Sequence, residues 1–238
     1  MTTMQIANPA AHDLVNETEL MLATLPLVGA TVLELGCGRA EKTRTLAASG
    51  RPADILALEV DQIQHARNLA QPLPGVTFAA GGAEAIPAAD ASVDIVLMFK
   101  SLHHVPVELM DQAFAEIARV LKPGGLAWIS EPVYAGELNE VFKLFNDEKN
   151  VREAAFAALC RAVERGPLQL RQQLFFNTRS HFDSFAAFDA RMLQVTHTDH
   201  QLSPELYAAV RDKFEGYLTP DGATFLNPQR VDLLVRAA

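Results

Sequence analysis

The chain has 238 residues, which is enough for one large domain or for a core that carries an insertion. Hydrophobic residues make up 49% and charged residues 21%, as in an ordinary globular protein with ample material for a core. The net charge of −9 disfavours a nucleic-acid partner, because proteins that bind nucleic acids usually present a basic face.

The cysteines and the apolar runs exclude several further classes. Cys37 and Cys160 lie far apart, so they form neither a disulfide framework nor a metal-binding set. No apolar run reaches the roughly 18 residues that a membrane span needs. The N-terminus also lacks the basic-then-apolar pattern of a signal peptide. We therefore expect a cytoplasmic protein without a membrane partner.

The first strong pattern is a strand, a glycine turn and a helix. A short helix is expected within residues 13–25, and the buried strand that begins at Thr31 ends in a tight turn at Gly36 and Gly38. Glycine tolerates the positive φ of such a turn and lets a ligand approach the backbone. The helix Glu41–Ser49 follows. This arrangement directs backbone N–H groups at a concave spot that suits a nucleotide-like ligand, although two glycines alone are weak evidence.

The second strand ends in carboxylates. Glu59 directly follows the apolar run Ile55–Leu58, about 20 residues after the glycine turn, where a carboxylate is placed to accept the hydroxyl groups of a ribose. We prefer Glu59 to Asp61 for this role. The alternatives are that both residues mark a solvated strand end, or that Asp61 caps the helix Gln62–Ala70.

Strands and helices continue to alternate. Val76–Ala80 predicts a third strand that ends at two more glycines, and Asp94–Phe99 predicts a fourth strand whose nearly unbroken apolar run indicates burial on both faces. Pro106 then suits the first turn of a helix, which ends at Lys122–Gly125. The fifth strand is expected at Leu126–Ser130. This alternation indicates an α/β fold with a doubly wound, mostly parallel, Rossmann-like sheet.

The strand signal disappears over residues 136–178, where two amphipathic faces predict a helical insertion after the fifth strand. It is longer than an ordinary connection and is expected to lie over the ligand crevice. A substrate lid and the surface of a homodimer are the two interpretations. Arg191–Thr196 and Val231–Val235 then predict strands six and seven of a seven-stranded sheet, with a helix opening at Ser203 between them. We expect a single domain over residues 1–238.

Four motifs occur in register. They are V-L-E-L-G-C-G at the first strand, L-A-L-E-V-D at the second, A-E-A-I-P followed by D-I-V-L-M at the fourth, and R-V-L-K-P-G-G-L-A-W before the fifth. With these motifs the chain resembles the class I S-adenosylmethionine-dependent methyltransferases over essentially its whole length. The resemblance is strongest to the small-molecule branch, which includes the quinone and natural-product methyltransferases.

The resemblance implies S-adenosylmethionine as the cofactor and assigns roles to individual residues. Gly36 and Gly38 would pass beneath the methionine part, Glu34 would order that loop, and Glu59 would hold the ribose. The cofactor-binding residues implied in this way are Glu34, Gly36, Cys37, Gly38, Glu59, Val60, Ala83, Glu84, Phe99 and Lys100.

Two departures from related patterns matter. Many relatives carry an Asp that binds the adenine amino group at the position of Gly82, so Glu84, a backbone carbonyl or water is expected to substitute. The Asn/Asp-Pro-Pro-aromatic tetrad that methylates the amines of bases is absent at Phe99–Leu102. Together with the acidic charge, this indicates a small-molecule acceptor and no nucleic acid.

A general base is needed only if the acceptor must lose a proton. His103 and His104 are the first candidates by position, and Glu131 and Tyr134 are the next. Of the two histidines, His104 is the candidate base, but a role as a wall of the cofactor pocket is the preferred interpretation. The cluster His197, Asp199 and His200 has the spacing of polar loop residues, so no metal is expected.

Three functions fit these patterns. A small-molecule methyltransferase is the leading hypothesis, and a non-catalytic S-adenosylmethionine-binding regulatory or assembly protein is the alternative. A nicotinamide-dependent dehydrogenase is disfavoured, because Glu41 occupies the position of the third glycine in the G-x-G-x-x-G pattern.

Overall fold

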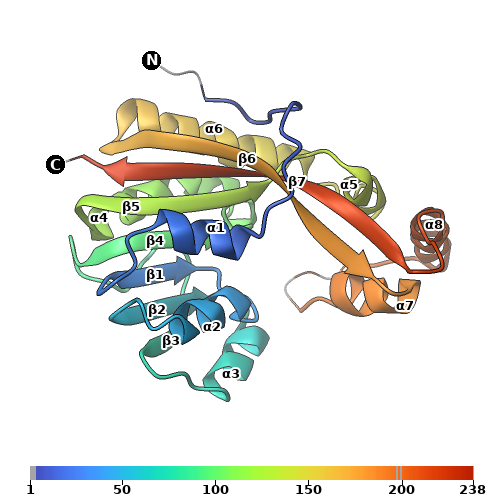
Figure 1. The fold of residues 1–238 in the computed structure, drawn as a ribbon, viewed down its shortest axis with the longest axis horizontal. Coiled ribbons are helices and arrows are strands. Elements are labelled where there is room, and N and C mark those ends of the chain that lie inside the picture. The colour runs from blue at the N-terminus through green and yellow to red at the C-terminus, as the bar shows by residue number, and fades with distance from the viewer. Residues whose placement is uncertain (1–3, 197, 199, 238) are drawn as a thin grey trace.

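The computed structural model describes residues 4–196, 198 and 200–237, and these residues build a seven-stranded sheet with helices on both faces (Figure 1). The strand order is β3-β2-β1-β4-β5-β7-β6. Strands β1 to β5 pair in parallel, and β7 runs antiparallel to both β5 and β6. The expected doubly wound, mostly parallel sheet of seven strands is therefore confirmed.

The strands are β1 (Thr31–Leu35), β2 (Asp54–Glu59), β3 (Val76–Ala80), β4 (Val93–Phe99), β5 (Leu121–Pro132), β6 (Leu168–Phe182) and β7 (Ala223–Arg236). The helices are α1 (Glu17–Thr24), α2 (Glu41–Ala48), α3 (Gln62–Leu69), α4 (Met110–Val120), α5 (Glu137–Phe142), α6 (Lys149–Arg165), α7 (Phe185–Phe188) and α8 (Pro204–Glu215). Shorter helical turns are η1 (Leu102–His104), η2 (Val107–Leu109) and the π-helical η3 (Asp189–Leu193).

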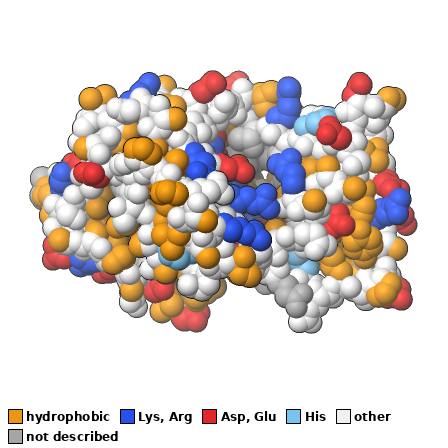
Figure 2. All heavy atoms as spheres, turned by 90° about the horizontal axis from the view of Figure 1, so that it is seen from below, with side chains coloured by type: hydrophobic (Ala, Val, Ile, Leu, Met, Phe, Trp, Pro, Cys, Tyr) orange, Lys and Arg blue, Asp and Glu red, His pale blue; other side chains and the backbone are white. Residues whose placement is uncertain are grey.

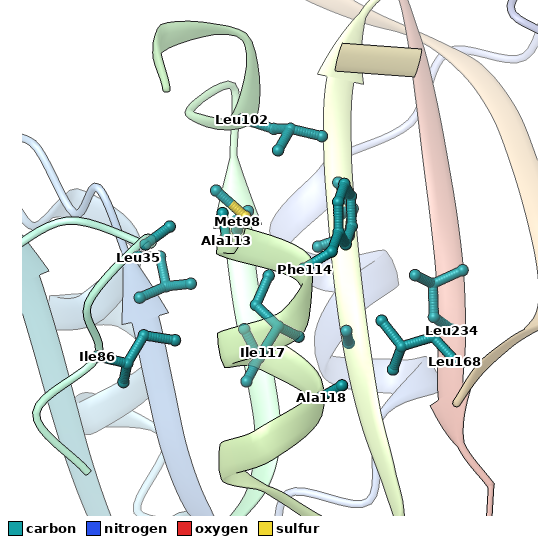
Figure 3. Packing of buried hydrophobic residues seen from close by; sticks show 14 of the residues in the cluster. Leu35, Ile86, Met98, Leu102, Ala113, Phe114, Ile117, Ala118, Leu168 and Leu234 are labelled. Atoms are coloured by element: carbon teal, nitrogen blue, oxygen red, sulfur yellow. The ribbon is translucent and has the colours of Figure 1, made fainter. Parts of the chain in front are cut away.

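The apolar run of β4 is buried from both sides, as its composition predicts. Val96 and Met98 face a core that includes α4 and α6, whereas Ile95 and Leu97 face a second core with α1 and α2. Figure 3 shows the first of these cores, with Phe114 and other side chains of α4 directed at the sheet. Successive side chains of a strand point to opposite faces, so a run without polar residues requires a helix layer on each side.

The topology places the ends of β1, β2 and β4 side by side. Leu35, the last residue of β1, pairs with Leu58 of β2 and with Met98 of β4. The chain winds outward from β1 in one direction and from β4 in the other, so the order reverses between them. Ligands of such sheets bind outside the carboxyl ends of the strands at this reversal.

The helical insertion expected after the fifth strand is confirmed by α5 and α6, but its expected extent of 136–178 is wrong. Helix α6 packs along α4 and β6, whereas α5 and the start of α6 border a cavity beyond the end of β4. Residues 168–178 belong to β6, an edge strand in which Leu168 and Leu170 alternate with polar residues until a bulge between Leu170 and Gln172 interrupts the alternation. Because the alternation is interrupted, the sequence pattern does not predict this strand.

The sixth strand expected at Arg191–Thr196 is also wrong, because residues 189–193 form the π-helical turn η3. This turn lies between α7 and α8, which connect the far ends of the long strands β6 and β7 (Figure 1). We call α7, η3 and α8 the cap. Its own apolar core contains Phe182, Phe188 and Phe214. The seventh strand is confirmed, since Val231–Val235 lies within β7.

Candidate functional site

The glycine turn is fixed against the end of β2. The N–H groups of Gly36 and Cys37 both donate to the carbonyl of Leu58, at 3.0 and 2.9 Å. Gly36 has φ +73° and Gly38 has φ +52°. A Cβ on Gly36 would lie 2.7 Å from the Cβ of Ser101, whereas Gly38 borders open space. The turn therefore needs both glycines, and it presents bare backbone to the crevice.

Glu59 joins the end of β2 to this turn. Its side chain is buried, and its carboxylate accepts hydrogen bonds from the N–H of Gly38 at 2.6 Å and of Asp61 at 2.9 Å. Asp61 instead caps α3, because it accepts the N–H groups of Ile63 and Gln64. The capping alternative for Asp61 is thus confirmed. Asp61 also borders the crevice, but Glu59 is the buried carboxylate there.

A cavity of about 670 Å³, which we call the nucleoside crevice, runs along the ends of β1, β2, β3 and β4. Val60 lines it with 62% of its surface exposed, which leaves an apolar side chain free to contact a flat ligand. The expected site residues that line it are Gly36, Gly38, Glu59, Val60, Ala83, Glu84, Phe99, Lys100 and His104. The cap contributes Arg191 and Met192, and the segment after η3 contributes Val195 and Thr196.

Glu84 occupies the place of the missing side chain at Gly82. A Cβ built on Gly82 would overlap the Glu84 carboxylate, and both residues line the nucleoside crevice. The carboxylate of Glu84 thus stands where an Asp side chain at position 82 would begin. Of the substitutes expected for that Asp, Glu84 is the one that this geometry supports.

Glu34 and Cys37 lie under the glycine turn. Glu34 is buried and accepts a hydrogen bond from the Thr43 hydroxyl at 2.6 Å, and burial raises its pKa to about 7. Burial likewise raises the pKa of the Cys37 thiol to about 12, so this cysteine is not a thiolate nucleophile. Glu34 also lines a second cavity of about 820 Å³ on the other side of the turn, next to α1, α2 and β6.

Lys100 stands where the cavities meet. It follows β4, has φ +56°, and lines the nucleoside crevice, the 820 Å³ cavity and a third cavity of about 290 Å³. Its side chain is accessible from these cavities but surrounded by protein, and this desolvation lowers its pKa. A left-handed backbone at a residue with a side chain is strained, and such strain is typical of functional sites.

The third cavity, which we call the histidine pocket, lies between η1, α5, the start of α6 and the cap. Both His103 and His104 line it. The Nδ1 of His103 is 2.5 Å from Oε2 of Glu131, whose other oxygen accepts the N–H of Leu102 at 3.0 Å. The buried Glu131 therefore fixes the ring of His103 and leaves Nε2 directed toward Glu148, 3.7 Å away.

Three of these side chains have the donor atoms of a metal site. The ligand atoms of His103, His104 and Glu148 lie within 4.8 Å of one another. Arg152, however, donates to Oε2 of Glu148 from two nitrogens, at 2.6 and 3.1 Å. Burial acts to raise the pKa of Glu148, but the charges of His103 and Arg152 outweigh it and lower the pKa. Because the guanidinium already satisfies this carboxylate, we interpret the cluster as a hydrogen-bonded network.

The catalytic candidates from the sequence do not all lie at the site. His104 lines both the nucleoside crevice and the histidine pocket. Glu131 and Tyr134 are absent from the described lining of the three cavities; Glu131 acts on His103, and the Tyr134 hydroxyl donates to Asp147 at 2.8 Å. In the loop that suggested a metal cluster, His197 and Asp199 lie outside the described residues.

Comparison with known proteins agrees with this geometry. A family model described as a methyltransferase domain matches residues 32–125, which contain β1 to β4, α4 and the glycine turn. Over these residues the chain is similar to methyltransferase domains, in agreement with its resemblance to the class I S-adenosylmethionine-dependent methyltransferases. The family's cofactor is S-adenosylmethionine.

Two curated methyltransferases are similar to part of the chain. The chain is 30% identical over 128 residues to a phthiotriol/phenolphthiotriol dimycocerosates methyltransferase of Mycobacterium ulcerans, covering 52% of this chain and 45% of that protein. It is 37% identical over 99 residues to a fatty-acid O-methyltransferase of Mycolicibacterium smegmatis, covering 41% of this chain and 35% of that protein. The chain thus spans less than half the length of these relatives.

The similarity in fold covers nearly the whole of this chain and not only the residues that the family model matches. The crystal structure of a protein described as a methyltransferase from Bacillus halodurans superposes with a TM-score of 0.63, covering 93% of this chain and 99% of that one at 14% identity. At this identity the likeness shows the fold alone. Among the described residues, no helix has the length and apolar composition that crossing a bilayer requires.

Proposed function

We propose that this protein transfers a methyl group from S-adenosylmethionine to an O, N, S or C nucleophile of a small-molecule acceptor. The observation that carries the proposal is the junction of cavities at Lys100 and His104. There the nucleoside crevice and the histidine pocket share lining residues, so a second molecule has space beside the cofactor site. A protein that only bound the cofactor would not need that second space.

The residues at the crevice fit the cofactor. The bare turn at Gly36 and Gly38 leaves room for the methionine part, Glu59 offers a buried carboxylate for the ribose, and Val60 offers an exposed apolar surface for adenine. When bound, the cofactor supplies a methyl group on a sulfonium, whose sulfur leaves with the electron pair of the broken bond. The protein's task is then to orient the acceptor and exclude water.

For an acceptor that carries a proton, the histidines are the available bases. Glu131 holds Nδ1 of His103, so a proton taken up at Nε2 is stabilised by carboxylates on both sides, from Glu131 and Glu148. His104 lies closer to the cofactor side, because it also lines the nucleoside crevice. We assign His104 to the acceptor boundary and His103 to proton uptake.

The proposal is tested in two steps. Calorimetric titration with S-adenosylhomocysteine and with NAD is expected to show saturable binding of the first and none of the second. Incubation with S-adenosylmethionine and a library of small acceptors is then expected to release S-adenosylhomocysteine. Binding without turnover across the library would favour the non-catalytic regulatory or assembly protein.

A further inference from the structure

We propose that the methyl acceptor carries an uncharged carboxamide, which the histidine pocket binds through the side-chain amides of Asn139 and Gln229. Asn139 lies on α5 and Gln229 on β7, and these two elements pack against each other. Both side chains line the histidine pocket. This inference rests on the proposed methyltransferase function and adds the chemical class of its substrate.

Each of these amides has one atom held by the protein and one atom left over. Oδ1 of Asn139 accepts a hydrogen bond from Nη1 of Arg152 at 3.1 Å. Nε2 of Gln229 donates to the carbonyl of Asn227 at 3.3 Å. Nδ2 of Asn139 and Oε1 of Gln229 are buried and have no hydrogen-bond partner among the residues that the structure describes. The wall of the pocket therefore keeps one spare donor and one spare acceptor.

Unpaired polar atoms of this kind point to a ligand. Buried polar groups are nearly always hydrogen-bonded, because an unpaired one destabilises the fold. Only 7% of Asn139 and 2% of Gln229 is exposed, so bulk water does not satisfy them. The last torsion of an amide side chain is soft, and a small rotation turns either atom toward a molecule in the pocket. The two amides together thus fit a ligand that accepts one hydrogen bond and donates another.

The charged side chains at the pocket are already paired with one another. Arg152 holds Glu148, and Glu131 holds His103. Lys100 also lines the pocket, but it stands at the junction with the nucleoside crevice. An ionic group on the acceptor would meet charges that are satisfied, whereas an uncharged polar group would meet the two unpaired amide atoms.

The basic side chains at the surface do not change this balance. Figure 2 shows Lys and Arg side chains gathered around a hollow near the middle of one face. Of the residues that line the cavities, Arg39, Lys42 and Arg179 border the 820 Å³ cavity beside the glycine turn, and they are absent from the described lining of the histidine pocket. Their positive charge lies on the side that we assign to the methionine part of the cofactor, away from the acceptor.

A carboxamide matches this pocket in polarity, charge and size. Its carbonyl would accept from Asn139 and its N–H would donate to Gln229, on two separate atoms, whereas a hydroxyl group has its donor and its acceptor on a single oxygen. The volume of about 290 Å³ accommodates roughly ten non-hydrogen atoms, at the ~30 Å³ that a water molecule occupies. Leu138 and Phe142 supply apolar wall for a small ring or a short chain.

The carboxamide anchors the acceptor and is not the group that is methylated. Asn139 and Gln229 are absent from the described lining of the nucleoside crevice, whereas His104 lines both cavities. The nucleophile is therefore a second polar atom of the acceptor, on the side of His104, where the methyl group of the cofactor is expected.

The test uses the full chain saturated with S-adenosylhomocysteine, titrated by calorimetry with benzamide, acetophenone, benzyl alcohol and benzoate. We expect benzamide to bind about 10-fold more tightly than acetophenone, which lacks the N–H donor and leaves Oε1 of Gln229 unpaired. We also expect it to bind about 10-fold more tightly than benzoate, whose charge finds no unpaired cation beside the two amides. Tighter binding of benzoate or of benzyl alcohol would assign the pocket to an anion or to a hydroxyl group and overturn the inference.

Asn139→Asp is the decisive variant, because it keeps an oxygen for Arg152 and removes the spare donor. Asn150→Asp is its control, since it adds the same charge at an exposed position of α6 outside the described lining of the three cavities. We expect Asn139→Asp to weaken benzamide binding about 10-fold while S-adenosylhomocysteine affinity stays within about 3-fold, and Asn150→Asp to change neither. Gln229→Met should remove the preference for benzamide over acetophenone.

Normal benzamide binding by Asn139→Asp, or an unchanged preference in Gln229→Met, would overturn the inference and assign these amides to the fold alone. If the wild-type protein binds S-adenosylhomocysteine but not benzamide, the inference fails while the proposed function stands. Failure of S-adenosylhomocysteine to bind wild-type protein would refute the proposed function instead.

Discussion

Replacing Glu59 by glutamine is a sharp test of the nucleoside crevice. The substitution keeps the shape of the side chain but removes its charge, in a position where the carboxylate is buried and accepts two backbone N–H groups. Asp61→Asn is the matched control, because it removes a carboxylate two residues away and keeps a side chain that caps a helix equally well.

The magnitude follows from the hydrogen bonds that change. Hydrogen bonds to a charged group contribute about 1.5–3 kcal/mol. The loss of this charge at the ribose is therefore expected to weaken the binding of S-adenosylhomocysteine by at least about 1.5 kcal/mol, a roughly 12-fold loss of affinity. The amide of glutamine can accept only one of the N–H groups of Gly38 and Asp61. The other is left without an acceptor, so the free energy of unfolding is expected to fall by about 1–3 kcal/mol.

Calorimetry measures the affinity of both variants, and urea unfolding measures their stability. We expect Glu59→Gln to show the weaker binding and Asp61→Asn to remain within about 3-fold of wild type, because its cap is retained. If Asp61→Asn lost more affinity than Glu59→Gln, or if Glu59→Gln bound normally, the assignment of the ribose to Glu59 would be refuted.

Three further predictions follow from the same site. Because burial raises the pKa of Glu34 from 4.5 to about 7, the folded protein holds this proton more tightly than the unfolded chain. The free energy of unfolding should therefore fall by up to about 3 kcal/mol as the pH rises through that window, and urea unfolding of Glu34→Gln should lack this slope. Gly36→Val should abolish S-adenosylhomocysteine binding in calorimetry, since its Cβ would meet Ser101, whereas Gly50→Val carries similar backbone strain in open space and should still bind. Removal of metal ions with EDTA should leave turnover unchanged, because Arg152 already satisfies Glu148; a loss restored by one added metal would show that the histidine pocket holds an ion.

The parallel half of the fold was predictable because its signals are local. The apolar run of β4 and the glycines after β1 each determine their own structure within a few residues, and the position of Glu59 follows from the end of its strand. Strand β6 was not predictable in this way. It pairs only with β7 in the sheet, about 50 residues later in the chain, and its polar outer face resembles a helical surface pattern.

The site shows the same division between local and distant information. The sequence places the histidines after the fourth strand and Glu131 at the end of the fifth, but their contact follows only from the pairing of Phe99 with Ser130. That register is visible only in the folded sheet, where it favours His103 as the oriented base. The sequence gave no reason to select Arg152 or Arg179. Arg152 lies in the first turn of α6, which was expected to be part of an insertion, and Arg179 lies in β6, which was not predicted as a strand.

A crystal structure of the protein with S-adenosylhomocysteine tests the central claim most directly. The account predicts adenosine in the nucleoside crevice, with its ribose on Glu59, its base between Val60 and Ala83, and its sulfur near Lys100. A nucleoside bound elsewhere, or a crevice closed by the cap with Glu59 turned away from the ligand, would contradict it.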